Sequence, residues 1–254
     1  PYYAGQPMIE SGNPRADMMR PELRAYYQPD IDDIVRRFGD FVLINSNFSV
    51  VNHFIANHSR FKVAEWAPAE RTDFYRSGLH AQKRQLFDAF LELLPTLSKA
   101  MRPYNIVVRP HPSENPETWR MAAAGLDNVH VLHEGPVVPW LAAARALVHN
   151  GCTSAVEAAV VGTPTFAYRP VISNQFDLPL PNELSHQCFD MESLFASLRR
   201  TLDQPPAVGR QLTPAQDAML HELIASVDGK FSCERILDAL DEYKSQLLPA
   251  PWAS

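Results

Sequence analysis

The chain has 254 residues, 46% of them apolar and 20% charged, so it can bury a hydrophobic core and is not of the disordered class. Its 23 basic and 29 acidic residues give a net charge of −6, which argues against a general nucleic-acid surface. No apolar run approaches the roughly 20 residues of a membrane span, and the polar, proline-interrupted first 30 residues do not form a signal peptide. Three scattered cysteines without metal-ligand spacing (Cys152, Cys188 and Cys233) favour a reducing compartment.

Short apolar runs bounded by turn residues predict a series of strands. These runs lie at residues 41–45, 106–108, 129–132, 146–149, 165–168 and 187–189. Residues 1–30 read as a linker with turn residues at 11–17, and Pro21 suits the first turn of a short helix. Residues 54–77 show no clear period and predict a loop with some helix.

Helices are predicted before, between and after the strands, at residues 30–38, 79–101, 116–124, 138–144, 154–161, 191–202, 215–225 and 233–247. Apolar residues three or four positions apart give residues 79–101 and 191–202 one apolar face each. Pro95 is expected to kink or break the longest helix, Asn115 marks a helix start, and Ser232 is expected to cap the last helix with its side chain.

Strands and helices that alternate at this length predict an α/β fold, a Rossmann-like parallel sheet with helices on both faces. Ligands of such sheets bind beyond the C-terminal ends of the strands. Asn45, Ser46 and Asn47 end the first strand and should face that cleft. Neither GxGxxG nor GxxxxGK[ST] occurs, so the standard dinucleotide and P-loop sites are unsupported.

One candidate binding element is RPHP at residues 109–112, directly after the second strand. The prolines on either side of His111 restrict the backbone, so the ring points in a defined direction and can donate to a phosphate oxygen. Arg109 could pair with an acidic group or with phosphate. The alternative is a histidine in a rigid surface turn.

A second candidate is the turn NGCTS at residues 150–154, between a strand and a helix. Gly151 permits close backbone approach, while Thr153 and Ser154 offer hydroxyls and the first N–H groups of a helix, which together suit an anion. The alternative is an ordinary helix cap. Ser154 and Glu157 also match a capping box, although the Glu157 carboxylate could instead accept two ribose hydroxyls.

Other side chains near this turn have two interpretations each. His149 could be a core histidine or could line the cleft. Cys152 at a helix start could have a lowered pKa and act as a nucleophile, but a small buried turn residue is the simpler interpretation. No G-x-S-x-G nucleophile elbow occurs, and the histidines have no spacing that demands a metal.

Taken together, these motifs resemble the C-terminal half of a GT-B glycosyltransferase, and more narrowly bacterial surface-carbohydrate (capsule and lipopolysaccharide) biosynthesis proteins. Those proteins share traits with CDP-glycerol glycerophosphotransferases and with sialyl- and Kdo-transferases that use CMP-activated donors. The matching segments are residues 12–17, 41–48, 109–112, 149–157 and 162–168. The turn here is His-Asn-Gly-Cys, whereas the glycerophosphotransferases tend to have an Asp-Tyr-Ser type, which leaves the donor open.

The resemblance implies a role for each motif. His111 would contact the donor phosphate, and Thr153 and Ser154 would bind phosphate through hydroxyl and backbone. Glu157 would hold the ribose, and residues 12–17 would be the interdomain crossover. These implied roles make His111 and Glu157 the candidate catalytic residues. Asn45, Ser46, Asn47, Arg109, Asn150 and Gly151 complete the expected nucleotide-binding set.

The implied organisation is a linker and crossover at residues 1–38, a nucleotide-sugar-binding domain at 39–228 and a C-terminal helix and tail at 229–254. The acceptor, a glycan or a lipid-linked sugar, would be bound by an N-terminal domain that this sequence does not contain. The nucleotide sugar is the substrate, with no separate cofactor and no metal. The expected location is the cytoplasm, with peripheral attachment to the inner membrane left open.

Two alternatives stay open. A UDP-sugar 2-epimerase-like enzyme has the same fold class, but it usually carries a Ser-Gly-Gly turn and paired acidic residues, whereas Glu157 is the single acidic residue here. The other alternative is a non-catalytic GT-B scaffold.

Overall fold

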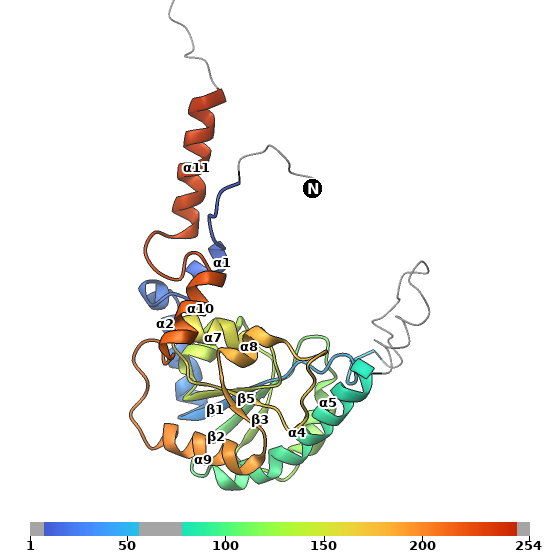
Figure 1. Ribbon diagram of the computed structural model, residues 1–254. Helices are drawn as coiled ribbons and strands as arrows, with labels where there is room; N and C mark the ends of the chain where they lie inside the picture. The colour runs from blue at the N-terminus through green and yellow to red at the C-terminus, as the bar shows by residue number, and fades with distance from the viewer. Residues whose placement is uncertain (1–7, 56–77, 248–254) are drawn as a thin grey trace, which may run out of the picture. The chain divides into compact units, whose positions relative to one another are not determined.

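The structure is a computed structural model that describes residues 8–55 and 78–247, with side chains described up to residue 243 (Figure 1). The loop with some helix expected at residues 54–77 therefore lies almost wholly outside the described residues. Its outcome stays a prediction.

The chain divides into two compact units, one of residues 27–211 and one that joins residues 1–26 to residues 212–254. We call them the larger unit and the smaller unit and describe each by itself. This division differs from the expected boundaries after residues 38 and 228, because each of those boundaries falls inside one of the units. The functional roles assigned to the three predicted segments stay predictions.

The larger unit contains a six-stranded parallel sheet with the strand order β3-β2-β1-β4-β5-β6. The α/β Rossmann-like fold class is thus confirmed, and each strand lies within one or two residues of its prediction. The strands are β1 (Phe41–Asn45), β2 (Asn105–Arg109), β3 (Val129–Val131), β4 (Ala146–His149), β5 (Thr165–Tyr168) and β6 (His186–Cys188).

The strands form because their apolar residues can be buried on both faces of the sheet. Val42 and Ile44 of β1 belong to the large core cluster, with apolar residues of α4, α5 and α9. Phe41, which points to the opposite face, packs edge-on against Phe38 and Trp140 at ring-centroid distances of 6.3 and 6.2 Å. The sheet is therefore covered by helices on both sides.

The helices of the larger unit largely match their predictions. They are α4 (His80–Ala100), α5 (Pro116–Ala122), α6 (Val137–Ala143), α7 (Ser154–Val161), α8 (Pro179–Glu183) and α9 (Met191–Leu202). Pro95 lies inside α4, so the predicted break is wrong, and Asn115 caps α5 as expected by accepting a hydrogen bond from Glu117 N at 3.1 Å. The short helix α8 was not predicted. Helix α2 (Arg24–Phe38) begins six residues before its predicted start and contains Pro29.

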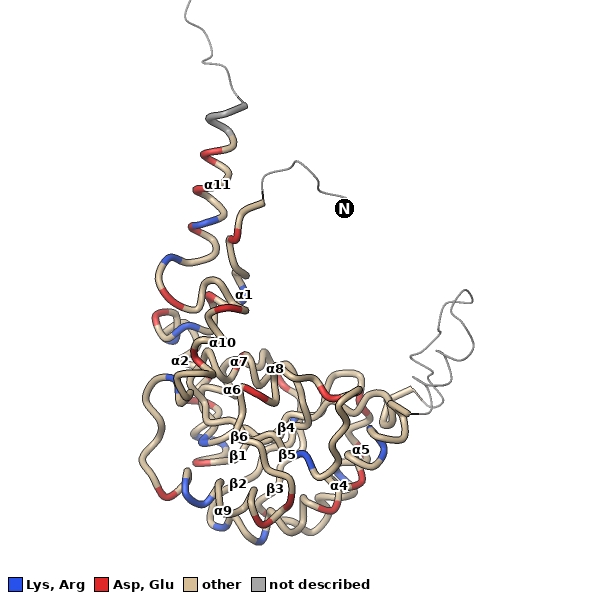
Figure 2. Tube along the Cα trace, viewed as in Figure 1, with Lys and Arg blue, Asp and Glu red and all other residues tan. Residues whose placement is uncertain are grey.

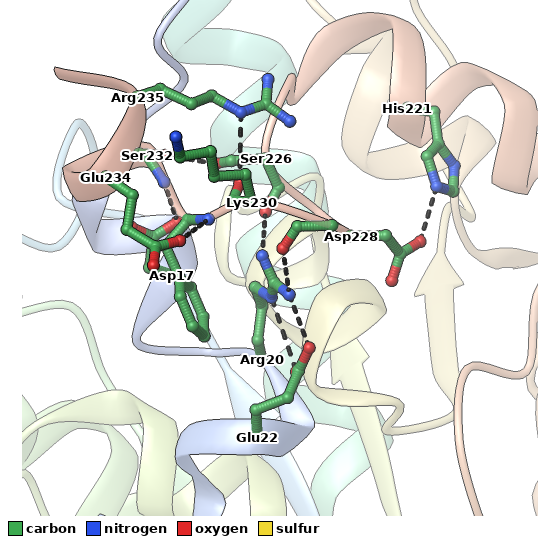
Figure 3. Close-up of polar contacts among 12 residues, drawn as sticks. Asp17, Arg20, Glu22, His221, Ser226, Asp228, Lys230, Ser232, Glu234 and Arg235 are labelled. Atoms are coloured by element: carbon green, nitrogen blue, oxygen red, sulfur yellow. Dashed lines mark hydrogen bonds and ion pairs between the residues drawn. The ribbon is translucent and has the colours of Figure 1, made fainter. Parts of the chain in front are cut away.

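The smaller unit holds α1 (Pro14–Asp17), the 3-10 turn η1 (Pro21–Leu23), α10 (Pro214–Leu223) and α11 (Ser232–Leu247). Helix α11 begins at Ser232, but the cap predicted from the Ser232 side chain is wrong. The carboxylate of Asp17 accepts hydrogen bonds from Ser232 N at 2.9 Å and Cys233 N at 3.1 Å instead (Figure 3). A side chain more than 200 residues away in sequence therefore caps this helix.

Acidic and basic residues are interspersed along the described chain (Figure 2). Within residues 8–55 and 78–247, no helix combines the length and apolar character needed to cross a membrane.

Candidate functional site

The candidate site lies where the sheet reverses its strand order, between β1 and β4. The register pairs Asn45 at the end of β1 with Arg109 of β2 and with His149 of β4. The loops that follow these three strands therefore leave the same edge of the sheet. In parallel sheets of this kind, the crevice at this switch point is where ligands bind.

Glu114 ties the loop after β2 to the loop after β1. Its side chain is 2% exposed, and its Oε1 accepts hydrogen bonds from Ser46 Oγ at 2.9 Å, Phe48 N at 2.9 Å and His111 N at 3.1 Å. Its Oε2 accepts another from Trp119 Nε1 at 3.0 Å. A buried carboxylate with four donors holds both loops in one geometry. No local pattern in the sequence marks Glu114, because its partners lie up to 68 residues away.

His111 is placed by this same carboxylate through its backbone N–H. Its half-buried ring accepts a hydrogen bond at Nδ1 from Ser113 N at 3.1 Å. An accepting Nδ1 is the unprotonated nitrogen, so the neutral ring carries its proton on Nε2. His111 can therefore donate from Nε2, as its predicted contact with a phosphate requires.

Two asparagines join the loop after β1 to the turn after β4. Asn150 Oδ1 accepts a hydrogen bond from Asn47 N at 3.1 Å, and Asn150 Nδ2 donates to Asn47 O at 3.3 Å. Next to them, Asn45 is 6% exposed and its Oδ1 has no hydrogen-bond partner among the described residues. The Asn47–Asn150 pair and Glu114 together link the loops after β1, β2 and β4 at the switch point.

His149 lies in the core beneath the turn after β4. Its ring is fully buried, accepts a hydrogen bond at Nδ1 from Gly151 N at 3.0 Å, and contacts Ser185 Oγ through Nε2 at 2.8 Å. Burial lowers the pKa of His149 to about 3, so the ring is neutral at physiological pH. Of its two interpretations, the structure supports the core histidine, which holds Gly151 in its left-handed conformation at φ +80°.

The turn then leads into α7, whose start differs from the predicted capping box. Thr153 precedes the helix in a helical conformation and its exposed side chain makes no capping hydrogen bond, and Ser154 is already the first helical residue. Ser154 is 6% exposed, and its Oγ has no partner among the described residues. The capping-box interpretation is therefore wrong. The half-buried Glu157 lies one turn into the helix.

The start of α7 suits an anion for two reasons. The N–H groups of Ala155 and Val156 bond back to the carbonyls of Cys152 and Thr153, and the N–H groups before them have no intrahelical acceptor. The positive end of the helix dipole adds to their attraction for negative charge.

The contacts of Arg109 hold its guanidinium away from the predicted pairing with a phosphate. Its guanidinium donates to Glu134 O at 2.6 Å and Gly135 O at 3.2 Å and lies over the Trp140 ring. Burial lowers the pKa of Arg109 to about 10, only partly offset by the charge of Glu134. These contacts support a structural role, in which Arg109 ties β2 to the loop after β3.

A small polar hollow opens beside the start of α7, on the side of β5. It is partly open to solvent, with about 250 Å³ of empty space when that solvent is included, and it is lined by residues of α4, the β4–α7 turn, the segment after β5, and α8. The polar residues of its lining are Lys83, Asn150, Gly151, Tyr168, Arg169, Asp177 and Asn182.

The sequence analysis found the β4–α7 turn but missed most of this lining. Arg169 could have been found, because it directly follows β5 at the same sheet edge. Lys83 and Asn182 had no local signal. Across residues 8–55 and 78–247, no three or more His, Cys, Asp or Glu side chains lie close enough to hold a metal ion.

No protein-family model and no curated protein sequence matches this chain. Among solved structures, it is similar to the UDP-GlcNAc 2-epimerase of Neisseria meningitidis bound to UDP-GlcNAc (11% identity, TM-score 0.48), with 92% of this chain and 54% of that one covered. It is also similar to the wall teichoic acid polymerase TagF with CDPG (16%, TM-score 0.46, 95% and 51% covered). A third is CalG4, the calicheamicin glycosyltransferase (16%, TM-score 0.45, 83% and 43% covered). The chain spans about half the length of these structures.

Proposed function

We propose that the larger unit binds the phosphate of a nucleotide-activated sugar at the switch point of its sheet and is the donor-binding half of a glycosyltransferase. The observation that carries this proposal is the linkage of three loops, by Glu114 and by the Asn47–Asn150 pair, around the start of α7. Such prior fixing lowers the entropy cost of binding and suits a ligand with several polar groups.

In this proposal, His111 Nε2 and the first N–H groups of α7 bind the donor phosphate. Ser154 supplies a buried hydroxyl that has no other described partner, and Glu157 accepts the ribose hydroxyls. As the bond between sugar and nucleotide breaks, negative charge grows on the departing phosphate, and these groups stabilise it. No metal is needed where they carry that charge.

The whole reaction needs a second half that binds the acceptor and places its hydroxyl over the anomeric carbon. The resemblance of the motifs to surface-carbohydrate biosynthesis proteins favours a CMP- or CDP-linked donor and a glycan or lipid-linked acceptor. In this proposal Arg109 holds the end of β2 to the loop after β3 and does not contact the ligand.

Calorimetric titration with CMP, CDP, UDP and GDP tests the proposal, using the wild-type chain, His111→Ala and the matched control His186→Ala. His186 is an exposed histidine on the edge strand β6. We expect one nucleotide class to bind, at least tenfold more weakly to His111→Ala and unchanged to His186→Ala. Selectivity for UDP would revive the epimerase alternative. Absence of all binding, here and in a longer chain that includes the acceptor half, would contradict the proposal and leave a scaffold.

A further inference from the structure

The hollow beside α7 is small and partly open to solvent, and about 250 Å³ of empty space, open solvent included, lies between its walls. It shares Asn150 and Gly151 with the turn that leads into α7. A ligand whose phosphate lies at the start of α7 could therefore place one further polar group in the hollow.

The charges that line the hollow do not cancel. Asp177 Oδ2 accepts hydrogen bonds from Arg169 Nη2 at 2.6 Å and Ser173 N at 3.0 Å, and its Oδ1 accepts one from Gln82 Nε2 at 2.7 Å. Arg169 and Asp177 thus form a hydrogen-bonded ion pair. Lys83 is the remaining charged residue of the lining and gives it a net positive charge.

Lys83 is held close to this space without a bonded partner. Its side chain is half-buried and makes no hydrogen bond or ion pair with any described residue, although Asp177 and Cys152 lie within electrostatic range. Burial lowers the pKa of Lys83 below its ordinary value, and Asp177 offsets part of that effect. A desolvated ammonium of this kind gains more from an anionic ligand than one in bulk water does.

A second, independent observation points to a ligand in the same place. Asn182, on α8, is 4% exposed and lines the hollow, and its Oδ1 has no hydrogen-bond partner among the described residues. Arg169 Nε, in the same lining, is likewise buried without a partner. Buried polar atoms are usually paired, so such atoms around one hollow indicate a missing partner. A carboxamide can turn either its NH₂ or its oxygen towards that partner.

We propose that Lys83 and Asn182 bind a second anionic group of the donor, next to the phosphate held at the start of α7. This inference rests on the proposed function. The second anion has two chemical sources: the β-phosphate of a nucleoside diphosphate, or a carboxylate on the carried sugar of a nucleoside monophosphate. In both cases Lys83 determines which class of donor the site accepts.

The test is calorimetric titration with CMP, CDP and CMP-N-acetylneuraminate, and with the uridine pair UMP and UDP. The variants are Lys83→Met, which removes the charge at similar length, Lys83→Arg, which keeps it, and the control Lys99→Met, an exposed lysine on the same helix α4. Thermal unfolding confirms that each variant is folded.

We expect Lys83→Met to weaken binding of the ligand with the second anion about tenfold or more, and to change binding of the nucleoside monophosphate less than about twofold. Lys83→Arg keeps most of the preference, and Lys99→Met keeps all of it. Loss of the CDP or UDP advantage identifies a β-phosphate. Loss of the tighter binding of CMP-N-acetylneuraminate relative to CMP identifies a carboxylate.

The inference is overturned if Lys83→Met binds every ligand as the wild type does, or weakens all of them equally. It is also overturned if the wild type shows no preference for a second anion. Failure of the wild type to bind any nucleotide, both in this chain and in the longer chain that includes the acceptor half, is a different result: it overturns the proposed function, and this inference falls with it.

Discussion

Asp17 and Arg20 in the smaller unit and Ser154 and Asn182 in the larger unit are all buried polar side chains, but they are hydrogen-bonded differently. Asp17 bonds to the start of α11, and Arg20 donates to Ser226 O and Gly229 O and lies over the Phe231 ring (Figure 3). Each is 3% exposed. Ser154 and Asn182 are nearly as buried, yet each has a side-chain oxygen without a partner.

This contrast extends to the rest of each unit. Every buried side-chain nitrogen or oxygen without a partner in the described residues belongs to the larger unit, and none belongs to the smaller one. A buried polar atom without a partner destabilises a fold, so its retention at a sheet edge where ligands bind suggests that a ligand completes it. In the smaller unit the buried polar side chains described here all have hydrogen-bond partners, whereas under the proposed function the larger unit keeps some of its buried polar atoms for binding.

The largest effect is expected from breaking the polar cluster of the smaller unit. Asp17→Ala removes the acceptor of two N–H groups at the start of α11 and should lower the free energy of unfolding by about 2–3 kcal/mol. Hydrogen exchange of the α11 amides and chemical denaturation measure it, with the exposed Asp241→Ala on the same helix as control. Nucleotide affinity should not change. A loss of affinity in a folded Asp17→Ala would erase the contrast between the units.

Lowering the pH should also reduce the stability that Asp17 contributes, as the Asp17→Ala substitution does. Burial raises its pKa, but the hydrogen bonds from Ser232 and Cys233 outweigh this, so the net pKa lies below the ordinary value of an aspartate. Its contribution to stability is present above the unfolded pKa and is lost as the pH falls through the folded one.

His149 is a buried side chain of the larger unit whose ring nitrogens both have hydrogen-bond partners. It should make the free energy of unfolding depend on pH to a comparable extent. The folded pKa of His149 is about 3, against 6.5 in the unfolded chain, so below pH 6.5 the unfolded state binds the proton and the folded state does not. Stability should fall as the pH drops from 6.5 towards 3, by about 2 kcal/mol between pH 6.5 and 5.

The measurement is urea unfolding at several pH values. His149→Gln, which cannot titrate, should show a shallower dependence on pH than the wild type, whatever its absolute stability. Equal slopes would mean that the pKa of His149 is the same in the folded and unfolded chains, which would contradict a buried neutral ring.

Ser154→Ala tests the binding side of the comparison directly. Removing a buried hydroxyl without a partner should leave stability unchanged or raise it by up to about 1 kcal/mol, while weakening nucleotide binding about tenfold. Thermal unfolding and calorimetry together give both values. Thr213→Ala is the opposite control, because Thr213 completes a real capping box at α10 and its loss should cost stability and no affinity. Lower stability with unchanged affinity in Ser154→Ala would count against a ligand role.

The smallest effect is expected at Glu157. Glu157→Gln keeps one acceptor oxygen but loses the charge, so a ribonucleotide should bind about fivefold more weakly. The matching 2′,3′-dideoxynucleotide should bind the variant and the wild type alike, because it lacks the hydroxyls that Glu157 would accept. A variant that weakens both nucleotides equally would place Glu157 away from the ribose.

Much of the fold was readable from local sequence, because a strand buried on both faces must be apolar along its whole length. FVLIN at β1, with each of its residues buried, is the clearest case. The break predicted at Pro95 was wrong. Pro95 lies on the exposed face of α4, and the many core contacts of that helix allow it to continue through a proline. Helix α8 has five residues, too few for any periodic pattern to show.

Sequence alone placed the candidate site at the C-terminal edge of the sheet, because strand ends and turn residues are local signals and parallel strands end together. Hydrogen-bonding roles were decided by the tertiary structure. The sequence pattern of a capping box could not reveal that Ser154 lies inside the helix, nor that Asp17 caps a helix 215 residues further on. Nor could it bring Lys83 of α4 to Asn182 of α8. Partners of buried polar groups come from distant segments, and only the packed chain brings them together.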